Sequence, residues 1–216
     1  MTDQGEAAAA GLRERKKELT RQRISAVATD LFLERGFDQV TVAEVARAAN
    51  VSTKTVFNYF PRKEDLYFDR GPQAKALISQ ALDRRAPDET TLRALRGLAL
   101  RQAESRHPLG RISAADRPFW RTAAESPALR ARLRELAADA ESWLAEVIVR
   151  TEGADPDAVW PRVKAAATIS ALRAVYVGAL GRILAGEPEE AVEADYLRDL
   201  RRAFDALERG FDSASR

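Results

Sequence analysis

The stretch that decides the fold runs from Thr20 to Leu66 and reads TRQRISAVATDLFLERGFDQVTVAEVARAANVSTKTVFNYFPRKEDL. Its first part predicts an amphipathic helix, because apolar residues recur there at a helical spacing: Ile24, Val27, Ala28, Leu31 and Phe32. Gly36 is predicted to end this helix, because glycine adopts the left-handed conformation common at helix ends with the smallest energetic cost. Thr41 and Glu44 then match a capping box ahead of a second helix that ends near Ala48.

The next residues predict a tight turn and a third helix. In the turn Ala49–Val51, Asn50 is the best non-glycine candidate for a positive φ. Ser52 is placed to cap the third helix, and its inward face is assigned to Val56, Phe57 and Phe60. Pro61 ends the helix, because the residue before a proline is pushed out of the helical region. The stretch is therefore a three-helix unit with a helix-turn-helix at about residues 41–60.

The third helix leaves polar side chains outside: Thr53, Lys54, Thr55, Asn58 and Tyr59. Hydroxyls, amides, ammonium groups and phenols are the groups that bond base edges and phosphates. A solvated helix face has a similar composition, and the position directly after a helix-turn-helix turn is what favours reading of DNA. Asn58 could bond adenine through a bidentate amide pair.

The charge balance supports this interpretation locally. The whole chain carries 35 basic and 33 acidic side chains, a formal charge of +2. From Leu12 to Lys63, eleven Lys and Arg stand against six Asp and Glu, a local +5. Residues 1–17 are expected to be a flexible basic N-terminal arm that displaces counterions or reaches a minor groove. A frayed, solvated helix start explains the same residues equally well.

Residues 18 to about 78 resemble the DNA-binding domain of the TetR family of transcriptional regulators (TetR/AcrR type). The resemblance rests on the run from Ala28 to Phe37, on Thr41–Ala46, on Val51–Ser52 and, most specifically, on Tyr59–Leu66. It implies an all-α homodimer whose N-terminal domains bind a palindromic operator in double-stranded DNA. It also implies a larger C-terminal helical domain, here residues 79–216, that dimerises and binds a small effector.

The resemblance assigns DNA contacts to Thr41, Val42, Ser52, Thr53, Lys54, Thr55, Asn58, Tyr59 and Lys63. Among these, Tyr59 corresponds to the aromatic or histidine that usually contacts phosphate. Lys63 corresponds to the phosphate-binding lysine at the start of a fourth helix, where the helix N-terminus would help. The chain departs from the family where Thr53–Lys54 replaces a basic residue and glycine. It departs again at Phe57, where tyrosine is usual, so one phenolic contact is absent.

The remainder reads as helices. They are expected over residues 62–85 with an interruption near Gly71–Pro72, 88–105, 114–124 and 127–151, then from Asp155 to Gly186, and over 189–210. In the last of them Ala191, Leu197, Leu200, Phe204 and Leu207 are placed inward. The resemblance makes the last two long helices the homodimer interface. A row of small residues, Ala171, Ala174, Gly178 and Gly181, would allow close helix packing there, although ordinary packing within one chain needs the same residues.

The effector pocket is assigned to aromatic residues of the C-terminal domain: Phe119, Trp120, Trp143, Trp160 and Tyr176. Arg121 or Arg173 could pair with an anionic group of the ligand. Binding pockets are mostly apolar with a few placed polar groups. Aromatics at helical spacing are also common in plain cores, so both interpretations stay open for each residue.

The composition argues against several other classes of function. The chain has no cysteine and one histidine, His107 in a predicted loop, so neither a thiolate metal site nor a histidine cluster is expected. Neither a glycine-rich phosphate loop nor a nucleophile elbow is present, and we expect no catalytic site and no cofactor. Apolar runs such as Ala165–Leu172 are too short to span a membrane, and the N-terminus lacks a hydrophobic signal core. We expect a cytoplasmic protein.

Taken together, these features predict a transcriptional repressor. It would bind a palindromic operator as a homodimer and be released by a small, hydrophobic effector. Two alternatives remain: a helical ligand- or protein-binding module that does not regulate transcription, and a TetR-type activator.

Overall fold

The computed structural model describes the backbone of residues 3–214 and the side chains of residues 15–211. Within residues 3–214 the secondary structure is entirely helical, which confirms the all-α prediction. Two compact units are present: residues up to Asp69 together with Thr122–Arg130, and Arg70–Arg121 together with the residues from Ala131 onward. The division between the units therefore falls after Asp69, whereas the sequence placed it after residue 78.

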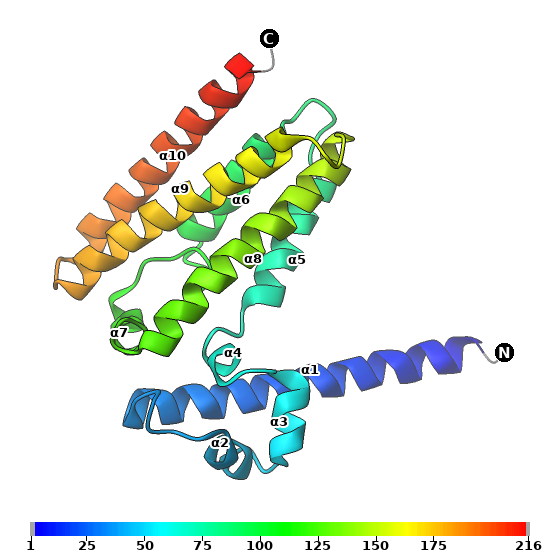
Figure 1. Ribbon diagram of the computed structural model, residues 1–216, viewed down its shortest axis with the longest axis vertical. Coiled ribbons are helices and arrows are strands. Elements are labelled where there is room, and N and C mark those ends of the chain that lie inside the picture. Colours follow the sequence, from blue (N-terminus) through cyan, green and yellow to red (C-terminus); the bar gives the residue numbers. More distant parts are fainter. Residues whose placement is uncertain (1–2, 215–216) are drawn as a thin grey trace. The chain divides into compact units, whose positions relative to one another are not determined.

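The first unit contains α1 (Asp3–Arg35), α2 (Val42–Ala48), α3 (Thr53–Tyr59) and α4 (Lys63–Tyr67) (Figure 1). α1 packs against α2 and α4, and α2 packs against α3. Ile24, Ala28 and Phe32 of the predicted stripe are fully buried on α1. Because α1 begins at Asp3, residues 3–17 are helical where a flexible arm was expected, and Met1 and Thr2 lie outside the described residues.

The start of α2 is fixed by the predicted capping box. The Thr41 backbone N–H donates to Glu44 Oε2 at 2.8 Å, and the Glu44 N–H donates to Thr41 Oγ1 at 3.2 Å. Arg35 Nη2 donates to the other carboxylate oxygen, Glu44 Oε1, at 2.8 Å. The carboxylate also accepts the Thr41 hydroxyl at 2.8 Å. The bonds that the carboxylate accepts from the Thr41 N–H, the strongest influence, from the Thr41 hydroxyl and from Arg35 favour its ionised form and lower the pKa of Glu44 from 4.5 to about 2.

The turn between α2 and α3 has the predicted geometry. Asn50 has φ 52°, in the left-handed region. The N–H of Ala49 donates to Val45 O at 2.8 Å, and the N–H of Val51 donates to Ala46 O at 2.9 Å. Ser52 Oγ accepts the N–H of Thr55 at 3.0 Å and so caps α3, which ends at Tyr59, two residues before Pro61. The local signals read from the sequence are confirmed here.

The second unit is built from longer helices: α5 (Gly71–Asp83), α6 (Thr91–Glu104), the 3-10 turn η1 (Ala114–Asp116), the first part of α7 (Arg117–Glu125), most of α8 (Pro127–Glu152), α9 (Val159–Leu184) and α10 (Glu189–Ala214). α10 packs along α9, beside which it runs in Figure 1, and also against α6. The core of the second unit has one cluster of buried residues around Leu95, Leu144 and Ile148 and another around Ile183, Val192 and Leu200.

The predicted helix ends in this unit are mostly confirmed. The helix expected over 62–85 is interrupted between Tyr67 and Gly71, and Gly153 and Gly186 have φ of 62° and 94° after α8 and α9. The predicted start of α9 at Asp155 is wrong. Asp155 Oδ1 accepts the N–H of Asp157 at 2.9 Å, and such a local side-chain bond competes with helix formation until Val159.

The register of α10 also differs from the prediction in one place. Ala191 was placed inward and is exposed, while Val192 and Tyr196 take the buried positions with Leu200 and Phe204. A shift of one residue rotates a helical position by about 100°, which is enough to move a small side chain such as Ala191 from the core to the surface. α10 also continues beyond the predicted end at Gly210, to Ala214.

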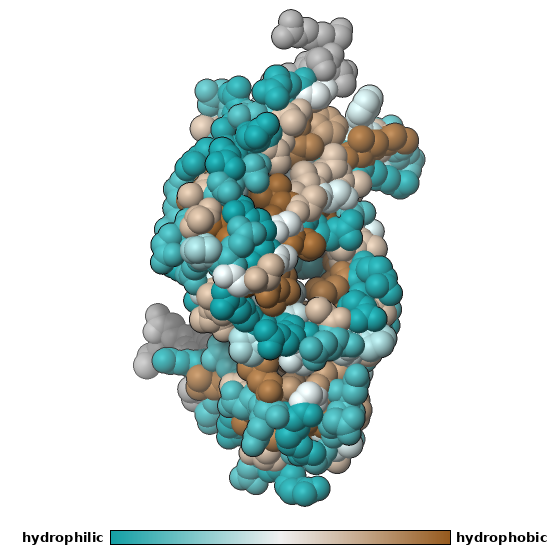
Figure 2. Space-filling model, turned by 90° about the vertical axis from the view of Figure 1, so that its left-hand side faces the viewer, coloured by the Kyte–Doolittle hydropathy of each residue, from teal (hydrophilic) through white to brown (hydrophobic). Residues whose placement is uncertain are grey.

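α9 has an apolar surface that the rest of its unit does not cover. Val159, Val163 and Val177 are exposed by 65%, 39% and 57%, and a Cβ added at Gly178 or Gly181 would meet nothing within 4 Å. By length and composition α9 could cross a membrane, a test that core helices of soluble proteins also pass, whereas Arg173 keeps its charge-free runs as short as the sequence analysis found. Figure 2 shows hydrophobic residues at the surface of the molecule among hydrophilic ones.

We predict that Thr41→Ala raises the pKa of Glu44 toward 4.5, because the Thr41 hydroxyl is one of the groups that stabilise the carboxylate. Since the folded pKa is depressed, the stabilisation by Glu44 is present above pH 4.5 and is lost as the pH falls toward 2. The measurement is the pH titration of the Glu44 carboxyl carbon by NMR in both proteins. An unchanged titration in Thr41→Ala would contradict the assigned cause.

Candidate nucleic-acid interface

The outward face of α3 is a continuous arc of side chains. At about 100° per residue, the order around the helix is Thr53, Phe57, Lys54, Asn58, Thr55 and Tyr59. The first four are exposed, Thr55 and Tyr59 are half-buried at the edge of the arc, and Val56 is fully buried opposite. The structure therefore brings together the five polar α3 residues that the sequence predicted to contact DNA.

Phe57 is a correction to the prediction. It was placed in the inward face with Val56 and Phe60, but it is 46% exposed while Phe60 is 2% exposed. Val56 and Phe60 lie four residues apart and occupy the buried side of this short helix, so Phe57 is turned away from them. The signal was available in the spacing, since one helix face cannot hold both Phe57 and Val56 at its centre.

The hydroxyl groups at the start of α2 and α3 are already bonded within the unit. Thr41 Oγ1 donates to Glu44 Oε2 at 2.8 Å, and Ser52 Oγ and Thr55 Oγ1 share a hydrogen bond of 2.8 Å. Each of these oxygens keeps capacity for a further partner. Val42, half-buried at the first position of α2, follows Thr41 directly. Thr41 and Ser52 thus cap the two helices as well as being predicted contacts.

Lys63 lies differently from the expectation of a free phosphate-binding side chain. Its Nζ donates to Phe37 O at 2.6 Å and lies 4.2 Å from the centre of the Phe37 ring and 5.7 Å from that of Phe32. Burial lowers the pKa of Lys63, because the charged form loses hydration. The Lys63 ammonium thus links the start of α4 to the loop after α1. A phosphate would have to compete with the Phe37 carbonyl for this ammonium.

The middle of α1 contributes cations beside the three-helix unit. Arg15, Lys16 and Arg23 are exposed. Arg21 instead donates to Asp69 O at 2.7 Å and lies 4.9 Å from the centre of the Phe60 ring. It therefore connects α1 to Phe60, at the end of α3, and to Asp69. The exposed members give this helix a basic surface of the kind that attracts a phosphate backbone.

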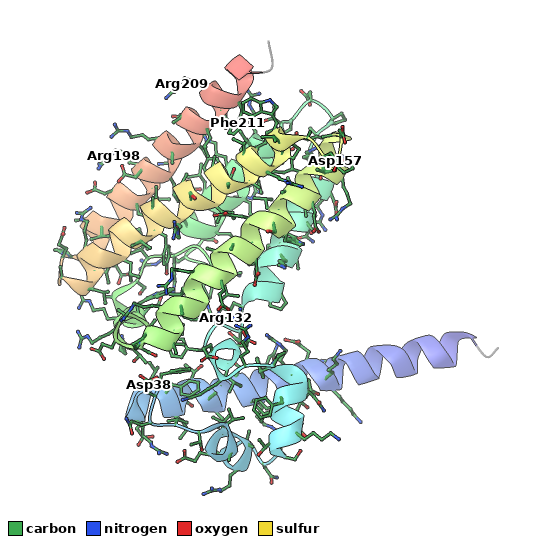
Figure 3. The ribbon with its side chains drawn as sticks, viewed as in Figure 1. Asp38, Arg132, Asp157, Arg198, Arg209 and Phe211 are labelled. Atoms are coloured by element: carbon green, nitrogen blue, oxygen red, sulfur yellow. The ribbon has the colours of Figure 1, made fainter. Side chains whose placement is uncertain are left out.

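A segment from outside the N-terminal region completes the first unit. Thr122–Arg130 contains the end of α7 and the start of α8, and Ala123, Ser126 and Leu129 in it are buried. Ser126 Oγ donates to Oδ1 of Asp38, which follows α1 and is labelled in Figure 3, at 3.1 Å. The sequence analysis assigned these residues entirely to the effector domain.

Three of the five predicted pocket residues come together in the second unit. The Phe119 and Trp120 ring centres are 5.1 Å apart, and those of Trp120 and Tyr176 are 5.6 Å apart. Tyr196, which the sequence analysis did not single out, extends the cluster at 6.2 Å from Tyr176. Burial is the main reason that the pKa of Tyr176 rises to about 12.

The other two predicted pocket residues lie elsewhere. Trp143 packs on the cluster around Leu95 and is 5.3 Å from Lys75 Nζ. Trp160 is 57% exposed and lies 6.2 Å from Phe211, the α10 residue labelled in Figure 3. Among the candidate anion partners, Arg121 and Arg173 are both exposed.

Two cavities in the second unit also differ from the predicted pocket. One, of about 330 Å³, lies between α5 and α6 and is lined by Leu77, Arg84, Arg85, Arg101 and Gln102 among others. The second, of about 300 Å³, shares Arg85 and is completed by α8 residues, including Val147 and Thr151. Neither is lined by the aromatic cluster. Among the described residues, no group of three His, Cys, Asp or Glu side chains could hold a metal ion.

Two protein-family models match the chain. Residues 24–69 match the model for bacterial regulatory proteins of the tetR family, and residues 98–212 match the MftR C-terminal domain. The chain is 30% identical over 151 residues to the HTH-type transcriptional regulator TcmR of Streptomyces glaucescens. That match covers 68% of this chain and 66% of the relative, so it spans about two thirds of either protein.

Solved structures agree with this assignment. The Thermus thermophilus FadR, a TetR-family repressor in complex with lauroyl-CoA, is 25% identical with a TM-score of 0.51, over 87% of this chain and 92% of that one. A SmeT–triclosan complex, at 18% identity and a TM-score of 0.52, covers 89% and 91% of the two chains and shows the same fold. The helix-turn-helix geometry and both family models lead to one conclusion: the chain belongs to the TetR family of bacterial transcriptional regulators.

Proposed function

We propose that this regulator is a repressor that binds a palindromic operator as a homodimer and is released by a small hydrophobic effector. The observation that carries the proposal is the exposed arc of α3, which begins directly after the Asn50 turn and holds Thr53, Lys54 and Asn58. Side chains of these types bond phosphates and base edges in a major groove. The regulator would act in the cytoplasm, where its operator is, and without catalytic chemistry or a cofactor.

The two alternatives make different demands on the molecule. A binding module without DNA activity has no need for the exposed polar arc of α3, and an activator would bind the operator in the same way as a repressor. Selection of bound fragments from a random DNA pool by the purified protein separates the first alternative. An enriched palindrome with half-sites about one helical turn apart supports the proposal, whereas an unenriched pool at moderate salt rejects it. Transcription from a promoter that carries the selected site then separates repressor from activator.

We expect Asn58→Ala to relax the preference at one base pair of each half-site, with a loss of about 1–3 kcal/mol of discrimination. Lys63→Ala should instead weaken binding to all sequences alike and reduce the salt slope by about one. Because Lys63 also bonds Phe37 O, its variant is assayed well below its melting temperature. Binding isotherms on the selected operator and on single-base variants give both quantities. Equal, sequence-independent losses from both variants would rule out base reading by Asn58.

The homodimer part of the proposal is supported by the exposed face of α9. Its valines and the open space over Gly178 and Gly181 form an apolar strip that a second copy could bury at close approach. α10, packed beside α9, would complete the interface as its second helix. Burial of this strip is the expected driving force of association.

We predict that Val177→Glu converts the dimer into a folded monomer, since Val177 is 57% exposed in the single chain and would be buried in the pair. Sedimentation velocity measures the association state, and circular dichroism checks the fold. Ala138→Glu, at an exposed position of α8, is the matched control and should leave the dimer intact. A Val177→Glu protein that remains dimeric would place the interface on another surface.

The effector part rests on the aromatic cluster of Phe119, Trp120 and Tyr176. The apolar rings and the hydroxyl of the half-buried Tyr176 have the composition of a pocket for a mostly apolar ligand with one polar anchor. Side-chain rearrangement would have to open space there, because the cavities present lie beside Arg85 instead. The lauroyl-CoA bound to the Thermus thermophilus relative makes a medium-chain acyl-CoA a rational first probe.

We expect lauroyl-CoA to lower operator affinity and to change the emission of Trp120. Trp143→Phe/Trp160→Phe leaves Trp120 as the only tryptophan and reports on the cluster, while Trp120→Phe is the control with a smaller expected change. Fluorescence titration and operator binding are measured in parallel. Tight binding of the probe with unchanged operator affinity would contradict release by this ligand class.

A further inference from the structure

The most exposed aromatic side chain of the first unit lies within the predicted DNA-reading face. Phe57 is 46% exposed, and around α3 it lies between Thr53 and Lys54, beside the end of the arc that Thr53 forms. Among the side chains that the structure describes, its ring has neither an aromatic nor a cation–π partner. An exposed apolar ring among these polar side chains gains free energy when a partner covers it.

The chemistry of Phe57 restricts what that partner can be. The ring lacks a hydroxyl, so it cannot donate to a phosphate or to a base edge as a tyrosine at this position would. In the major groove the distinctive apolar group of a base pair is the 5-methyl of thymine. We infer that Phe57 reads thymine through van der Waals contact with this methyl group. The inference rests on the proposed operator binding and adds a base preference to it.

The neighbours of Phe57 fit the same base pair or the next one. Asn58 follows Phe57 in the chain, so the two residues are about 1.5 Å apart along the helix axis, less than one base step. An A·T pair offers the adenine N6 and N7 groups to an amide and the thymine methyl to an apolar ring. Thr53, one helical turn before Phe57, lies beside it on the arc. The selected half-site should therefore contain an A·T-rich step where α3 enters the groove.

Replacement of thymine by deoxyuridine tests the contact, because it removes the methyl group and leaves every hydrogen-bonding group in place. Each thymine of one selected half-site is replaced in turn, and operator affinity is measured by fluorescence anisotropy. We expect one position at which affinity falls about fourfold, the effect of losing one buried methyl. Replacement at the equivalent position of both half-sites should give about fifteenfold if the effects add.

Variants then connect the effect to the side chain. Phe57→Ala should bind the thymine and deoxyuridine operators equally, whereas Phe57→Leu, which keeps an apolar side chain, should retain part of the difference. Leu33→Ala is the matched control, since Leu33 is an apolar residue of α1 that is 39% exposed, and it should keep the full difference. Circular dichroism verifies that the exposed substitutions leave the helices formed.

The outcomes are distinguishable. Enrichment of a palindrome followed by equal affinity for thymine and deoxyuridine at every position overturns the role of Phe57 and leaves operator binding standing. The same holds if the deoxyuridine effect persists unchanged in Phe57→Ala. Absence of any enriched sequence overturns the proposed function and this inference together.

Discussion

The direction in which α3 presents its side chains depends on the backbone of Asn50. Residues with a Cβ rarely take its left-handed conformation, and asparagine is among the few that do so at small cost. The turn lets Val51 N–H bond Ala46 O, and α3 starts two residues later, at Thr53, in a new direction. α2 and α3 have seven residues each, too few to be stable alone in water. Their caps at Thr41 and Ser52 and this turn therefore hold the arc from Thr53 to Tyr59 in place.

The two units are connected in different ways along the chain. Between α4 and α5 the helix is interrupted by Phe68–Arg70, where the first unit ends. α7, in contrast, crosses from one unit to the other without a break, with Trp120 in the second unit and Ala123 in the first.

The sequence predicted those features that depend on neighbours in the chain. Gly36, the Thr41 capping box, Asn50, Ser52 and Gly153 are all determined by a few adjacent residues, and the structure has each of them as expected. Helix type and most helix ends followed from the same signals. This is why the all-α architecture and the position of the polar arc could be derived before any contact was known.

The features that were missed depend on contacts between distant segments. Whether Phe57 or Phe60 is buried is decided by what packs on α3, and Lys63 meets Phe37 across 26 positions of sequence. Of the five aromatic residues assigned to the pocket, only Phe119, Trp120 and Tyr176 meet, and Tyr196 joins them from α10. Neither helix propensity nor hydrophobic periodicity specifies which helices become neighbours. The residues that make up a side-chain cluster therefore could not be predicted from them.

The uncovered valines of α9 have a consequence for how much of this protein a cell can keep folded. Exposure of an apolar surface of this kind to water is unfavourable until a second chain covers it. By mass action, the stability of a chain that dimerises through this surface would rise with its own concentration. At low concentration, chains of the proposed homodimer would spend longer unpaired, with the apolar strip open to chaperones and proteases. Abundance and turnover would then be coupled through the same helix, so that the protein level itself becomes part of the regulation.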